Sequence, residues 1–75
     1  MEIKWEEGFK IGVSVEDNTV TISANREGLL SLANHLIALV REDPGSHIHL
    51  DEHNSLEDNS AELIIERMEH EVRGD

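Results

Sequence analysis

The sequence predicts a small α+β domain, in which a mostly antiparallel four-stranded sheet in the order ββαββ carries one helix across one face. An extra N-terminal strand is an open addition to this scheme. The one long apolar stretch, residues 25–43, repeats at three- and four-residue steps, as in an amphipathic helix. The segments on either side alternate between apolar and polar residues, as strands do. A chain of 75 residues has room for one core, so we expect a single domain spanning residues 1–75.

The N-terminal segment has its apolar residues at odd positions, which predicts a strand with one face turned inward. These residues are Ile3, Trp5, Phe9, Ile11, Val13 and Val15. The alternation is interrupted at Glu7 and Gly8. Either one long strand bends there, or a loop at residues 6–8 joins two short strands with Gly8 in the left-handed conformation. The bent strand is the favoured interpretation, and Trp5 and Phe9 are expected to pack in the core.

The next segment predicts a β-hairpin. Residues 16–19 form a cluster of turn-favouring residues, and residues 19–24 then alternate again. Val20, Ile22 and Ala24 fall on one side of this second strand, which is expected to face the core.

The helix is predicted to begin at Asn25, whose side-chain oxygen can accept a hydrogen bond from an amide of the first turn. Gly28 costs up to about 1 kcal/mol relative to alanine inside a helix, so we expect a neighbouring strand to pack closely against it. Pro44 and Gly45 end the helix near Arg41 or Glu42.

One face of this helix is predicted to be buried against the sheet and the other to be solvated. The expected buried stripe is Leu29, Leu32, Ala33, Leu36, Ile37 and Val40. Ser31, Asn34 and His35 lie opposite and are expected to face solvent.

The C-terminal half predicts two more strands joined by a polar loop. Residues 46–52 alternate, with Ile48 and Leu50 pointing inward and the histidines outward. Leu56 is the expected buried anchor of the loop, and residues 61–68 form the last strand. The full inward set of the sheet is then Ile11, Val13, Val15, Val20, Ile22, Ala24, Ile48, Leu50, Leu63 and Ile65.

The chain is strongly acidic, with six basic and seventeen acidic residues and a net charge of −11. Residues 1–50 carry four basic and eight acidic residues, a net −4, and residues 51–75 carry two and nine, a net −7. Such a polyanion is repelled by nucleic-acid phosphates and by anionic membranes, so neither is an expected partner, whereas a basic protein is favoured. The chain has no cysteine and no apparent signal or membrane segment, so a cytoplasmic location is expected.

The outward face of the third strand holds the one group with metal-ligand chemistry, His47, His49 and Asp51. Neighbours on one strand face are about 6–7 Å apart, so both imidazoles reach a single ion only if their side chains converge. We therefore expect no metal or other cofactor, and a metal-binding module at these three residues is kept as an alternative. A nucleophile in a marked context, an oxyanion donor set and a glycine-rich phosphate loop are all missing, so an enzyme is not expected.

Two strings give the sequence a resemblance to a known family. They are ANREGLLSLANHLIAL at residues 24–39 and GSHIHLDEHNSLEDNSAELIIE at residues 45–66. Together they resemble the bacterial polymorphic-toxin immunity proteins of family thirty-two, over about the C-terminal two thirds of the chain. The resemblance implies a protein that binds and neutralises a cognate toxin, often a nuclease, encoded beside it.

Charge clustering and the resemblance together predict where such a partner would bind. The expected contact residues are His47, His49, Asp51, Glu52, His53, Glu57, Asp58, Glu62 and Glu66. They would occlude a basic surface of the toxin without any catalysis. A regulatory interaction domain that forms a homodimer is the remaining alternative.

Overall fold

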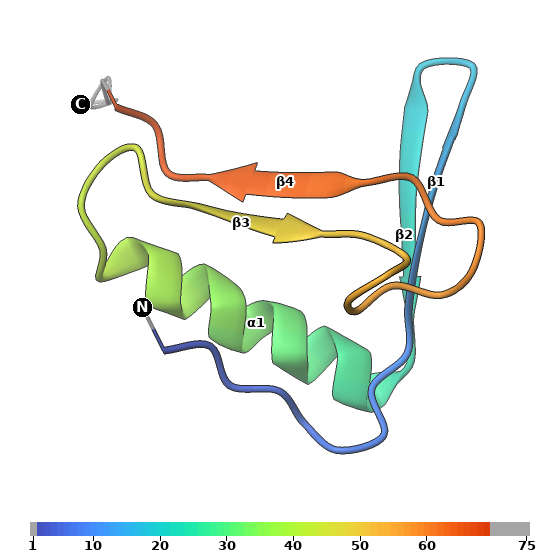
Figure 1. The fold of residues 1–75 in the computed structure, drawn as a ribbon, viewed down its shortest axis with the longest axis horizontal. Coiled ribbons are helices and arrows are strands. Elements are labelled where there is room, and N and C mark those ends of the chain that lie inside the picture. The colour runs from blue at the N-terminus through green and yellow to red at the C-terminus, as the bar shows by residue number, and fades with distance from the viewer. Residues whose placement is uncertain (1, 70–75) are drawn as a thin grey trace.

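The computed structural model describes residues 2–69, and its elements follow the predicted order. They are β1 (Ile11–Glu16), β2 (Thr19–Ala24), α1 (Arg26–Val40), β3 (His47–Leu50) and β4 (Leu63–Glu66) (Figure 1). The α+β class and the single helix are confirmed for the described residues. The single four-stranded sheet is wrong, because the strands form two separate two-stranded antiparallel sheets, β1–β2 and β3–β4.

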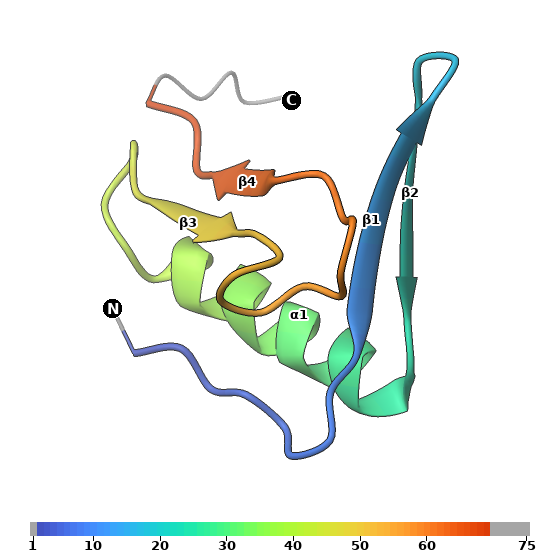
Figure 2. The same ribbon diagram turned by 45° about the vertical axis from the view of Figure 1, so that its right-hand side comes forward.

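The two sheets stay apart because a loop segment takes the free edge of β1. The Glu57 amide donates to the Ile11 carbonyl at 2.9 Å, and the Ala61 amide donates to the Val13 carbonyl at 2.9 Å. The Val13 amide in turn donates to Ser60 Oγ at 3.1 Å. These bonds satisfy edge groups of β1 that another strand would otherwise pair. The β1–β2 hairpin therefore stands across one end of the β3–β4 sheet (Figure 2).

The N-terminal segment forms no regular strand between residues 2 and 10, so the favoured bent strand is wrong. A turn occupies this region instead, with the Phe9 amide donating to the Glu6 carbonyl at 3.2 Å. Gly8 has a φ of +83°, so the left-handed glycine of the loop interpretation is confirmed. Before this turn the segment runs along the helix (Figure 1), and the Glu6 amide donates to Ser31 Oγ at 2.8 Å.

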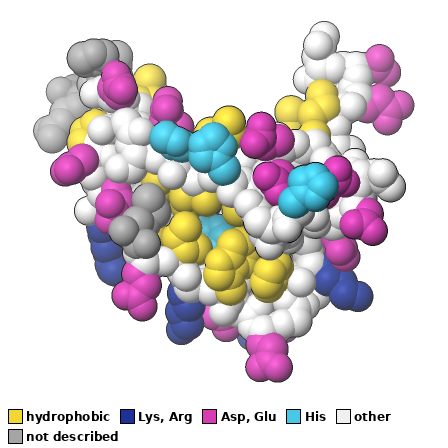
Figure 3. Space-filling view, in the orientation of Figure 1, with side chains coloured by type: hydrophobic (Ala, Val, Ile, Leu, Met, Phe, Trp, Pro, Cys, Tyr) yellow, Lys and Arg dark blue, Asp and Glu magenta, His cyan; other side chains and the backbone are white. Residues whose placement is uncertain are grey.

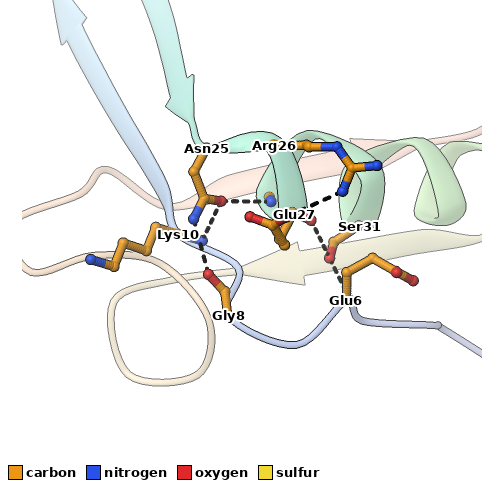
Figure 4. A network of polar contacts seen from close by, with 8 residues as sticks. Glu6, Gly8, Lys10, Asn25, Arg26, Glu27 and Ser31 are labelled. Carbon is orange, nitrogen blue, oxygen red and sulfur yellow. Dashed lines mark hydrogen bonds and ion pairs between the residues drawn. The ribbon is translucent and has the colours of Figure 1, made fainter.

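Asn25 joins the helix to the segments around it, and its predicted capping role is confirmed (Figure 4). Its Oδ1 accepts from the Gly28 amide at 2.7 Å and from the Lys10 amide at 3.0 Å. Its Nδ2 donates to the Gly8 carbonyl at 2.9 Å. One amide side chain thus ties the first helical turn, the start of β1 and the N-terminal turn together.

The close packing expected at Gly28 is also confirmed. A Cβ atom there would collide with the Lys10 carbonyl oxygen and would lie 3.0 Å from both Ala24 Cβ and Ile11 Cγ1. Only glycine lets the helix backbone approach β1 this closely.

The helix ends as predicted, with Arg41 as the C-cap residue. Arg67, which follows β4, donates from Nη1 to the Val40 carbonyl at 2.9 Å and to the Glu42 carbonyl at 2.7 Å. A cation at this end of a helix also offsets the negative pole of the helix dipole.

The rotation of α1 differs from the prediction. Its buried residues are Gly28, Ser31, His35 and Leu39. Most of the stripe expected to be buried is open to solvent, with Leu29 57%, Leu36 50% and Val40 71% exposed. His35, expected to face solvent, is 0% exposed. The contact at Gly28 and the Ser31 hydrogen bond turn this line of the helix inward, and the apolar stripe is turned outward as a result.

The core is small. Its fully buried hydrophobic residues are Ile11, Val13, Leu39, Ile48, Leu50 and Leu56. Four of the ten predicted inward positions are among them, and Ala24, Leu63 and Ile65 are partly buried against the cluster. Leu56 is confirmed as the loop anchor.

Three predicted inward positions are wrong, because Val15, Val20 and Ile22 are 60%, 59% and 43% exposed. They lie on the hairpin, which projects beyond the rest of the fold (Figures 1 and 2). Within residues 2–69, no other element covers the end of this hairpin.

His35 packs against aromatic side chains instead of hydrogen-bonding. Its ring lies edge-on to Trp5 with 4.2 Å between centroids, and Trp5 lies 4.4 Å from Phe9. Neither ring nitrogen has a hydrogen-bond partner among residues 2–69. Burial away from water lowers the pKa of His35 below 6.5.

This buried imidazole predicts sensitivity to acid. Between the lowered folded-state pKa and the ordinary value of 6.5, the unfolded chain binds a proton that the folded chain excludes, so stability falls as the pH drops through this window. The loss is at most about 1.4 kcal/mol per pH unit for one proton. Urea unfolding of the wild type and of His35→Leu at a series of pH values measures the effect. The variant should show a flatter dependence, and equal slopes would contradict the assignment.

Candidate partner-binding surface

The strand β3 presents two histidines to solvent, as the sequence predicts. Ile48 and Leu50 are 5% and 2% exposed, whereas His47 and His49 are exposed on the opposite side of the strand. The two imidazole rings lie edge to face with 4.8 Å between centroids. The prediction that this segment is extended, with its histidines outward, is therefore confirmed.

The neighbouring strand β4 adds carboxylates and one apolar side chain to the histidine pair. His47 pairs with Glu66 across the sheet, and His49 pairs with Ile64, which is 51% exposed. Glu62 Oε2 lies 3.7 Å from His49 Nδ1, an ion pair that exists while the imidazole is protonated. Figure 3 shows histidine and acidic side chains gathered on this face of the molecule.

Two of the predicted contact residues, Asp51 and Glu52, stabilise the turn after β3 through hydrogen bonds with backbone amides. Asp51 Oδ1 accepts from the amides of His53 and Asn54 at 2.8 and 3.1 Å. Glu52 Oε2 accepts from the Asn59 amide at 2.8 Å, and Glu52 Oε1 lies 3.8 Å from His53 Nε2. The half-buried Asp51 carboxylate thus has a structural task that the sequence pattern did not reveal.

Glu57 and Asp58 lie elsewhere on the molecule. Both are exposed, and together with Gly12, Ser14 and Ser23 of the hairpin they line a shallow groove. The backbone bond between Glu57 and Ile11 carries this part of the loop to the edge of β1. The predicted acidic contact residues therefore lie in two places, with Glu57 and Asp58 beside the hairpin and Glu62 and Glu66 beside the histidines.

An apolar groove that the sequence did not predict adjoins the histidine pair. Its volume is about 520 Å³, and it is lined by Ile3, Trp5, Phe9, Ile48, Leu50, His49, Asn54 and Ser55. Trp5 and Phe9 were expected in the core, and they do pack against it while staying partly exposed. Alternation along the sequence marks the side on which they lie, but it does not tell a covered position from one beside an open groove.

The alternative of a metal site gains no support from the geometry. Residues 2–69 hold no group of three or more histidine, aspartate or glutamate side chains arranged to bind a metal ion. Although His47 and His49 are close, the Asp51 carboxylate is bonded to the amides of its turn.

A search of residues 2–69 for membrane-spanning helices found no candidate.

The bonds of Asp51 predict different outcomes for two substitutions. Asp51→Ala removes the acceptor of two turn amides and should lower the free energy of unfolding by about 0.5–1.5 kcal/mol per bond lost. Asp51→Asn keeps an oxygen in the same place and should retain most of the stability. Urea unfolding measures both, with Asp58→Ala at an exposed position as the control. Equal stability of the three variants would refute the structural role.

A comparison with known protein families finds a match to this chain. The family model described as immunity protein 32 matches residues 19–68, which hold β2, α1, β3 and β4. The match begins a few residues before the strings that carry the resemblance, and it contains every predicted contact residue. Neither the curated proteins nor the solved structures include a significant match. Since the family model spans two thirds of the sequence, the chain belongs to the immunity protein 32 family.

Proposed function

We propose that this immunity protein neutralises a cognate bacterial nuclease by covering the basic surface with which the toxin binds its nucleic-acid substrate. One observation carries the proposal. Between His47 and Glu66 the chain has six acidic residues and no lysine or arginine, and this whole stretch lies inside the family match. A nuclease must offer positive charge to phosphates, so an acid-rich domain of this size is complementary to it.

Electrostatics would act first, during the approach of the two proteins. Complementary charge steers diffusing partners together and raises the association rate at low salt. Glu62 and Glu66 stand beside the exposed histidines, and a toxin lysine or arginine could pair with them in place of His49.

The apolar groove would supply the contact that holds the complex. Interfaces draw most of their binding energy from a few aromatic or arginine anchors that are sealed from water by surrounding polar contacts. Trp5 and Phe9 lie in the groove, and His49 and Asn54 stand at its edge. A basic side chain with an apolar stem fits such a surface, because its stem can lie on the aromatic rings while its charge reaches the carboxylates.

The proposed contact set keeps the predicted residues but assigns them three roles. His47, His49, Glu62, Glu66 and His53 would touch the toxin directly. Asp51 and Glu52 would hold the turn in shape, and Glu57 and Asp58 would extend the negative field toward the hairpin. Inhibition by occupying the basic surface of the toxin needs no catalysis. The cytoplasm is the proposed place of action, because a nuclease finds its substrates there.

Reversing charge beside the histidines tests the proposal. Glu62→Lys combined with Glu66→Lys should weaken binding to the toxin encoded beside the gene by at least about tenfold, mainly by slowing association. The matched control is Glu7→Lys with Glu16→Lys, two exposed positions outside the surface that give the same change in net charge. Surface plasmon resonance at low and high salt measures the association rate and the affinity of each double variant. Equal affinity of the two double variants for the toxin would show that only the overall net charge matters, and it would refute the proposed binding site.

A further inference from the structure

The helix α1 carries an apolar stripe along its solvent side. Leu29, Leu36, Ile37 and Val40 are 57%, 50%, 52% and 71% exposed. With 15 residues, the helix is about 22 Å long. At its C-terminal end the stripe meets a groove of about 440 Å³, which is lined by Leu36, Leu39, Val40, Ile65, Glu66 and Arg67. An apolar surface this long on a small domain is typical of a protein interface.

The inward side of the same helix explains why the stripe is open. Gly28, Ser31 and His35 face the core, so the large aliphatic residues are turned away from it. An amphipathic helix normally buries its apolar stripe against another element. Among residues 2–69, no element covers the stripe.

The distribution of charge favours a second copy of this chain as the occupant of the stripe. In a chain of net charge −11, residues 26–41 carry only Arg26, Glu27 and Arg41. Glu27 Oε2 lies 3.3 Å from Arg26 Nη1, so this carboxylate is paired. The two grooves that adjoin the stripe are lined by three acidic and three basic residues, which are Glu2, Lys4, Arg41, Glu42, Glu66 and Arg67. The surroundings of the stripe therefore carry balanced charge, and a second, equally acidic copy can approach it with less repulsion than at the β3–β4 face. A basic toxin finds complementary carboxylates on the β3–β4 face instead.

The sequence of the stripe also fits pairing with itself. Ala33 is exposed and lies at the midpoint of α1. An antiparallel two-fold crossing centred on Ala33 would place Leu29 opposite Ile37 of the other copy, and the small side chain would let the helices approach closely. We propose that the stripe of α1, Leu29, Ala33, Leu36, Ile37 and Val40, is the interface of a homodimer, which leaves the histidine face free for the toxin.

Sedimentation velocity over a range of concentrations tests the dimer without any toxin. The wild type should be dimeric at micromolar concentration. Ala33→Arg places two cations at the two-fold axis and should weaken the dimer by at least about 100-fold, because like charges in contact cost several kcal/mol. Thr21→Arg, at an exposed position of β2, adds the same charge as a control and should stay dimeric. Circular dichroism shows whether each variant keeps its helix.

The dependence of dimerisation on salt concentration provides a second test, because salt screens the repulsion between two chains that each carry a net charge of −11. Dimerisation should therefore strengthen as the salt concentration rises. A wild type that is monomeric at every concentration, or a folded Ala33→Arg variant that dimerises as the wild type does, would overturn the proposal. A monomeric wild type whose toxin binding is lost only in Ala33→Arg would assign the stripe to the toxin. Failure of the dimer would leave the proposed toxin site untouched.

Discussion

The close contact between Gly28 and β1 is the constraint on which the rest of the fold depends. Because the helix backbone lies against the Lys10 carbonyl and Ile11, α1 can take only one rotation about its axis. Asn25 reinforces that rotation, because it bonds at once to the first helical turn, to Lys10 just before β1 and to the N-terminal turn. The rotation buries His35 and turns Leu36 outward.

This rotation gives the molecule two surfaces of different chemistry. Figure 3 shows the first, where histidines and carboxylates border a hollow lined with hydrophobic side chains. The second is the aliphatic side of α1, which carries little charge. In the two proposals made above, these surfaces have separate tasks: the first would attract a basic toxin by charge, and apolar contact between copies at the second would enlarge the small core.

The sequence predicted the local structure well and the packing less well. Element order, the Asn25 cap, the close approach at Gly28 and the outward histidines all follow from neighbouring residues, and all are confirmed. The failures concern long-range geometry. Periodicity identifies the apolar side of α1. Whether that side faces this chain's core depends on the Lys10 carbonyl, just before β1, which no helical pattern contains. The four-stranded sheet failed for a similar reason, because the Glu57 and Ala61 amides bond to the edge of β1.

The rotation of α1 can be measured directly by nuclear Overhauser contacts between side chains in solution. The structure predicts strong contacts from the His35 ring to the Trp5 indole, and from the Gly28 α-protons to the γ1-methylene of Ile11. These contacts lie within one chain, so they hold whether or not the protein dimerises. Contacts from the Leu36 methyls to Ile48, with none between His35 and Trp5, would mean that the helix buries its aliphatic side and would contradict the account.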